Sequence, residues 1–110
     1  MPQFVEVARL DEFVAGAPIV VCVSDTSVAV FSIGGQLFAI EDACVRCGAS
    51  LSSGSLHDHE VTCARCEWQY DVTNGRVNGV PALRIDTFSV RTTGARVMVA
   101  AKADDSGKLP

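Results

Sequence analysis

Two pairs of cysteines, each with two residues between its members, constrain this chain more than any other feature of the sequence. The pairs are Cys44 with Cys47 and Cys63 with Cys66, and 15 residues separate them. Each pair can form a tight turn that presents two sulfurs to one point, and the intervening loop can bring the two turns together. The spacing therefore predicts four thiolates around a metal ion or an iron–sulfur cluster. The simpler alternative is four reduced thiols that bind nothing.

The size and charge of the chain exclude several classes of protein. Of its 110 residues 48% are hydrophobic, which is enough for a modest core and too much for a disordered tail. A net charge of −4 argues against a nucleic-acid partner, because phosphate binding needs a basic patch. We expect a single domain over residues 1–101, followed by a polar C-terminal tail over residues 102–110.

The sequence shows no targeting or membrane-spanning segment. Its N-terminus lacks a basic region followed by an apolar run, and uninterrupted apolar stretches such as residues 19–23 reach only five residues. The odd count of five cysteines does not suit a disulfide framework. We therefore predict a soluble, cytoplasmic protein with reduced thiols, in which Cys22 is a buried small hydrophobic residue.

Short runs of alternating or β-branched apolar residues, separated by turn residues, predict an all-β sandwich or barrel. A sustained helical period is absent from the sequence, and only residues 10–14 favour a helical turn. Glycine-containing turns at residues 34–35 and 74–75 predict hairpins. The predicted strands are residues 4–8, 19–23, 28–33, 36–40, 56–62, 68–72, 76–77, 83–85, 88–91 and 96–100.

Several short motifs surround the cysteines in a fixed order. They are LFAIEDAC at residues 37–44, GASLS at 48–52, VTC at 61–63, WQYD at 68–71, NG at 74–75 and GVPAL at 79–83. With these motifs the chain resembles the Rieske ferredoxin domain from residue 28 to residue 100. The resemblance implies an antiparallel β-sandwich with a small rubredoxin-like or zinc-ribbon-like metal-binding subdomain. It places the metal-binding loops at residues 43–50 and 62–70 and a proline-containing loop at residues 78–83.

The expected ligands depart from the Rieske pattern. Rieske centres use two cysteines and two histidines, and Cys44 and Cys63 match the two cysteines. Arg46 stands at the position of the first histidine, with Cys47 one residue later, and Cys66 stands at the position of the second. Arginine keeps its proton and cannot bind a metal, so we expect four cysteine ligands. Three kinds of metal centre are compatible with these ligands: a [2Fe-2S] cluster, a single iron in Fe(Cys)4, and a structural zinc ion.

Five residues are candidates for a supporting role around the ligands. Gly48 follows the first pair and leaves its backbone N–H free to approach a sulfur. Arg46 and Arg65 occupy matching positions inside the two pairs, where they offset the negative charge of four thiolates. By the resemblance, the Tyr70 hydroxyl bonds a ligand sulfur and Pro81 belongs to a loop that covers the centre.

The resemblance implies a small electron-transfer protein that is not itself an enzyme. Such a carrier takes single electrons from a reductase and passes them to an oxygenase-like terminal enzyme. We expect a monomer, without nucleic-acid or membrane partners, whose docking is steered by acidic residues near the centre. The alternative is a structural or binding module on the same fold, in which a zinc ion stabilises the domain and carries no electrons. The proposed steering residues are Glu41, Asp42, Asp58 and Glu60.

Overall fold

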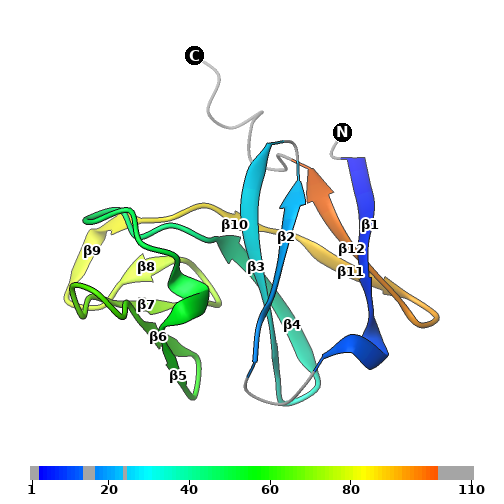
Figure 1. Ribbon diagram of the computed structural model, residues 1–110, viewed down its shortest axis with the longest axis horizontal. Helices are drawn as coiled ribbons and strands as arrows, with labels where there is room; N and C mark the ends of the chain where they lie inside the picture. Colours follow the sequence, from blue (N-terminus) through cyan, green and yellow to red (C-terminus); the bar gives the residue numbers. More distant parts are fainter. Residues whose placement is uncertain (1–2, 14–16, 24, 102–110) are drawn as a thin grey trace.

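The computed structural model describes residues 3–13, 17–23 and 25–101. Within these residues the chain forms strands β1 to β12 and two three-residue 3-10 turns, and the strands make three antiparallel sheets (Figure 1). No helix in this part of the chain is long and apolar enough to cross a membrane. The predicted polar tail, residues 102–110, lies outside the described residues.

Two of the sheets form a sandwich around one apolar core. The first sheet has the order β1–β12–β11 and the second has the order β10–β4–β3–β2. Their inward side chains, which include Val23, Val28, Phe88 and Val99, pack together. The strands are β1 (Gln3–Arg9), β2 (Ile19–Val23), β3 (Thr26–Ile33), β4 (Gln36–Glu41), β10 (Thr87–Phe88), β11 (Val90–Thr93) and β12 (Arg96–Ala101).

The third sheet is a meander that lies at one end of the molecule, on the left in Figure 1. We call residues 44–48, which follow β4, the first knuckle, and residues 63–67, between β6 and β7, the second knuckle. The 3-10 turn η2 (Leu51–Ser53) connects the first knuckle to this sheet. The strands are β5 (Ser55–His57), β6 (Glu60–Thr62), β7 (Gln69–Asp71), β8 (Arg76–Val77) and β9 (Val80–Arg84).

Strand β3 is buried on both faces, because the third sheet covers the side that the sandwich leaves open. Successive residues of a strand face opposite sides, yet residues 28–31 are all buried. Val28 and Val30 belong to the sandwich core, whereas Ala29 and Phe31 belong to a second core shared with the third sheet. This second core contains Cys44 and Cys63, so the knuckles are anchored to the sandwich by apolar packing.

Two predicted segments have a different structure. The predicted strand over residues 56–62 is a hairpin, because Asp58 adopts a left-handed backbone (φ 56) and the chain turns at residues 58–59. Aspartate tolerates that conformation better than most residues. The predicted proline loop over residues 78–83 is a turn at Asn78 and Gly79 that leads into strand β9.

The prediction for Cys22 is wrong, because its side chain is exposed. In β2 the burial alternates, and Val21 and Val23 take the inward positions. The predicted helical turn is the 3-10 turn η1 (Leu10–Glu12), and the expected last residue, Val14, lies outside the described residues.

Candidate metal centre

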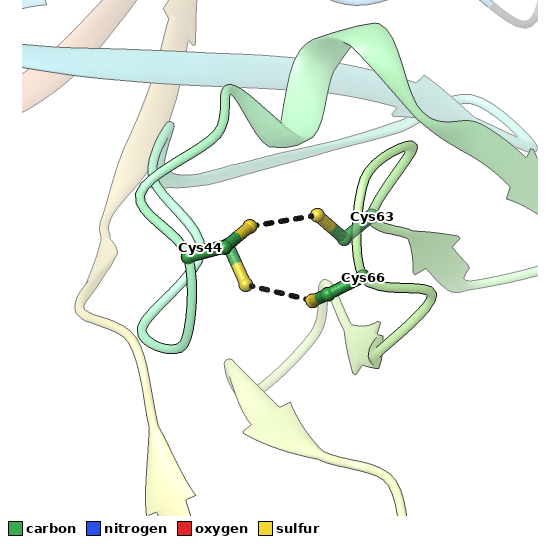
Figure 2. Close-up of side chains that lie close together, drawn as sticks. Cys44, Cys63 and Cys66 are labelled. Carbon is green, nitrogen blue, oxygen red and sulfur yellow. Dashed lines mark hydrogen bonds between the residues drawn. The ribbon is translucent and has the colours of Figure 1, made fainter.

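The four cysteine sulfurs of the two knuckles converge on one point, as the spacing predicts. Cys44 Sγ lies 3.6 Å from Cys66 Sγ (Figure 2). Cys47 Sγ lies 3.6 Å from Cys63 Sγ. All four sulfurs lie within 4.8 Å of one another. Each close pair joins one knuckle to the other, so the shortest sulfur contacts link the two loops. Within the described part of the chain, no other group of histidine, cysteine and acidic side chains meets in this way.

The two knuckles repeat one backbone geometry. In the first, the Gly48 N–H donates to the Cys44 carbonyl at 2.9 Å, and in the second, the Glu67 N–H donates to the Cys63 carbonyl at 3.0 Å. The residue that closes each turn has a left-handed backbone, with φ 80 at Gly48 and φ 69 at Glu67. Glycine adopts this conformation freely, whereas it costs other residues about 1–2 kcal/mol. The prediction that the Gly48 N–H approaches a sulfur is therefore wrong, because that N–H closes the turn.

Tyr70 connects the third sheet to the first knuckle. Its ring is fully buried, its hydroxyl donates to Cys44 Sγ at 3.1 Å, and the same oxygen accepts the Val45 N–H at 2.9 Å. Burial raises the pKa of Tyr70, and the Cys44 thiol beside it raises it further, so the hydroxyl keeps its proton and acts as a donor. Tyr70 lies where the Rieske resemblance places it.

The buried sulfurs are arranged to be thiolates. Burial raises the pKa of Cys44, but the Tyr70 hydroxyl and nearby backbone N–H groups outweigh it and lower the pKa to about 6. At Cys63 the backbone N–H groups of Cys66 and Arg65 likewise outweigh burial and lower the pKa of the thiol. The backbone N–H of Trp68 lowers the pKa of Cys66, yet burial and the three neighbouring sulfurs raise this pKa to about 11. Neighbouring thiolates repel one another, and a bound cation would remove this repulsion and favour the deprotonated form of all four sulfurs.

The remaining predicted residues lie beside the knuckles. The Arg46 N–H points at Cys44 Sγ at 3.4 Å, while the Arg46 guanidinium stacks over Trp68, with Cζ 5.2 Å from the ring centroid. The Arg65 side chain is exposed, and its backbone N–H faces Cys63. Whether either charge offsets the thiolates stays a prediction. Pro81 lies in β9, and its side chain is outside the described part of the structure.

Two residues near the knuckles have structural roles that the sequence analysis did not predict. Asp42 is buried, and its carboxylate accepts the backbone N–H of Ser52 at 2.7 Å and the Ser52 hydroxyl at 3.0 Å. The prediction that Asp42 steers docking is therefore wrong, because this carboxylate closes the loop around the knuckle. Gly54 lies so close to β6 that a Cβ there would come within 1.8 Å of the Thr62 carbonyl oxygen. An aspartate directly before the cysteine loop, with serines after it, was the available signal for the first.

Comparison with known proteins identifies the family. Residues 3–104 match the Rieske [2Fe-2S] domain family. The chain belongs to the Rieske family. It is 28% identical over 98 residues to the ferredoxin component of the naphthalene 1,2-dioxygenase system of Pseudomonas aeruginosa, covering 88% of this chain and 94% of that one. It is 32% identical over 95 residues to the ferredoxin component of biphenyl 2,3-dioxygenase of Rhodococcus jostii (strain RHA1), covering 86% and 78%.

Solved structures agree with this assignment. The ferredoxin of carbazole 1,9a-dioxygenase from Nocardioides aromaticivorans IC177 superimposes with a TM-score of 0.85 at 29% identity, over 91% of this Rieske chain and 99% of that chain. A ferredoxin in complex with the reduced oxygenase of carbazole 1,9a-dioxygenase superimposes with a TM-score of 0.80 at 27% identity, over 88% and 92%. These comparisons confirm the predicted all-β, Rieske-like antiparallel fold.

The iron–sulfur cluster that defines the Rieske family needs two imidazole ligands, which this site does not supply. His57 and His59 are exposed at the β5–β6 turn, where His59 packs edge-on against Phe38, and neither belongs to the sulfur group. The donor set at the knuckles is therefore four sulfurs, with no nitrogen.

The sulfur spacing gives a second test of the cluster. Four sulfurs bound at about 2.3 Å to one tetrahedral ion lie about 3.8 Å apart. In a two-iron cluster two such tetrahedra share an edge, so sulfurs at opposite ends lie at least about 5 Å apart. The observed 3.6 Å pairs have the spacing of two ligands on one ion, which occurs in both kinds of centre, and the 4.8 Å limit lies between the two calculated spacings.

Proposed function

We propose that this Rieske-family protein is a one-electron carrier that binds a single iron ion through Cys44, Cys47, Cys63 and Cys66. The observation that carries the proposal is the convergence of four sulfurs, from two matching knuckles, within 4.8 Å of one another. Iron held in this way exchanges one electron between its ferric and ferrous states. The knuckle backbones hold the four sulfurs through turns anchored in the second core, which limits their movement when the charge of the centre changes.

The relatives support a place in a multicomponent system. They are named as ferredoxin components of dioxygenases, and a ferredoxin of this fold has been solved in complex with an oxygenase. On this basis the chain receives electrons from a reductase and delivers them to a terminal oxygenase, and it is a carrier rather than an enzyme. We propose that it acts in the cytoplasm as one domain over residues 1–101.

A zinc-stapled structural module is the second candidate. The same tetrahedron of sulfurs suits Zn²⁺ as well as it suits iron, and zinc would stabilise the fold without any redox chemistry. A four-cysteine two-iron cluster is the third possible centre, and it would need only slightly longer distances between the sulfurs bound to different irons. These alternatives differ in metal, sulfide content and colour.

The test is the metal and acid-labile sulfide content per chain, read with the visible spectrum, on protein purified from iron-replete cells. One iron without sulfide, with a colour that bleaches on reduction, is the expected result. Colourless protein that contains zinc would refute the carrier function, and two irons with two sulfides would refute the single-ion centre. Cys47→Ser should lose the metal. Cys22→Ser, which removes the exposed thiol of β2, is the matched control and should keep it.

A further inference from the structure

The metal centre approaches the surface at one place. In each knuckle the first cysteine is buried, with Cys44 3% and Cys63 0% exposed, whereas Cys47 and Cys66 are only partly buried. The second cysteine of each pair thus lies on the solvent side of the centre. Because electron transfer weakens steeply with distance, the surface around Cys47 and Cys66 is where a redox partner must dock.

We call the residues beside these two cysteines the metal-end surface: Val45, Arg46, Ala64, Arg65 and Trp68. Arg46 comes from the first knuckle, yet its guanidinium stacks on Trp68, which follows the second knuckle. This contact crosses between the loops and makes their tips neighbours. Val45 is 47% exposed, and Arg46, Ala64 and Arg65 are exposed as well. The metal-end surface therefore combines a small apolar spot with two guanidinium groups.

The metal-end surface carries two positive side chains on a chain whose net charge is negative. The net charge of the protein is −4, but the charged residue within each knuckle turn, between its two cysteines, is an arginine. The nearest carboxylate along the chain is Glu67, the residue that closes the second knuckle. Among the expected steering residues, Asp42 is buried, and Asp58 lies at the β5–β6 turn.

We propose that the metal-end surface docks on an anionic face of the redox partner, where carboxylates surround an apolar spot that covers Val45. This inference rests on the proposed electron-carrier function. Arginine suits such a contact, because its planar guanidinium pairs with carboxylates through two hydrogen bonds and loses its hydration easily. Complementary charge at the two arginines would also orient the protein so that the metal-end surface faces the partner.

The charge at this surface can be measured without the partner. Iron-loaded protein is reduced with one equivalent of dithionite electrons and mixed in a stopped-flow instrument with ferricyanide or with hexaammineruthenium(III). In each reaction one electron leaves the ferrous centre, which becomes ferric, and the oxidant becomes ferrocyanide or hexaammineruthenium(II). The first reagent is an anion and the second a cation, so the ratio of their rate constants reports the local charge.

The decisive variant is the double substitution Arg46→Gln and Arg65→Gln. We expect its rate with ferricyanide to fall at least about fivefold at low salt, its rate with the ruthenium complex to rise, and both differences to shrink as salt is added. Glu67→Gln should shift the ratio in the opposite direction. The matched control is Arg91→Gln with Arg96→Gln, which removes the same charge from β11 and β12, away from the third sheet (Figure 1).

Each outcome has one meaning. A selective fall for the knuckle variant supports the inference. Equal behaviour of the knuckle variant and the β11–β12 control would refute it, because the local charge would then not govern access to the centre. If metal-loaded protein reacts with neither oxidant, the proposed function fails and this inference fails with it.

Discussion

The clearest test of the knuckle geometry is a pair of opposite substitutions at equivalent positions. Gly48 and Glu67 close the two turns with left-handed backbones, at φ 80 and φ 69. Glu67→Gly removes a side chain from a conformation that disfavours one, and Gly48→Ala adds a Cβ to the same conformation. A Cβ at Gly48 would meet nothing within 4 Å, so the change there probes backbone strain without steric overlap.

The expected free energies follow from the backbone angles. A left-handed conformation costs a residue with a Cβ about 1–2 kcal/mol, and the extra freedom of glycine in the unfolded chain offsets about 0.5–1 kcal/mol of that. Glu67→Gly should therefore stabilise the fold by about 0.5–1 kcal/mol, and Gly48→Ala should destabilise it by a similar amount. Within the described residues the exposed Glu67 side chain makes no hydrogen bond or ion pair, so its loss removes no specific contact.

The assay is thermal unfolding at equal metal loading, together with the rate at which a chelator removes the metal. A change of 1 kcal/mol corresponds to roughly 4 °C in a domain of this size. Glu67→Ala is the control, because it removes the same charge but keeps the Cβ. If the glycine and alanine variants at Glu67 unfold at the same temperature, or if Gly48→Ala unfolds no earlier than the parent, the strain argument is wrong.

Three further predictions concern the contacts that hold the first knuckle. Tyr70→Phe removes the hydroxyl that donates a hydrogen bond to Cys44 Sγ. Because this bond should stabilise the more negative, reduced centre by about 1 kcal/mol more than the oxidised centre, its loss should lower the reduction potential by roughly 40 mV, measured by voltammetry. Asp42→Asn keeps the shape but weakens the pairing with Ser52, so chelation should remove the metal faster, with a loss of about 1–2 kcal/mol in urea unfolding. Gly54→Ala places a Cβ 1.8 Å from a β6 carbonyl oxygen and should cost more than about 2 kcal/mol by the same assay. An unchanged potential, release rate or urea midpoint, respectively, would contradict each prediction.

Local sequence patterns predict most of the strands and the meeting of the four sulfurs. Alternating residues and glycine turns are local signals, and two cysteines with two residues between them form a turn whatever the rest of the chain does. For this reason the boundaries of β2 agree with the prediction, and the sulfurs of Cys44, Cys47, Cys63 and Cys66 meet as the spacing indicates.

The tertiary structure alone decided which faces are covered. The run of residues 19–23 contains only apolar side chains, so it does not show which side faces the core, and the fold leaves Cys22 outside. The burial of Asp42 depends on its contact with Ser52 in η2, which lies ten residues further along the chain.

The pairing of the sulfurs is also a tertiary result. Each close contact joins the two knuckles, Cys44 to Cys66 and Cys47 to Cys63, and the spacing within one pair contains no information on that distance. The separation of the loops is set by how β6 and β7 pack on β3 and β4 through the shared core. Burial and sulfur spacing depend on contacts between residues that are distant in the chain, whereas sequence patterns report only the local conformation.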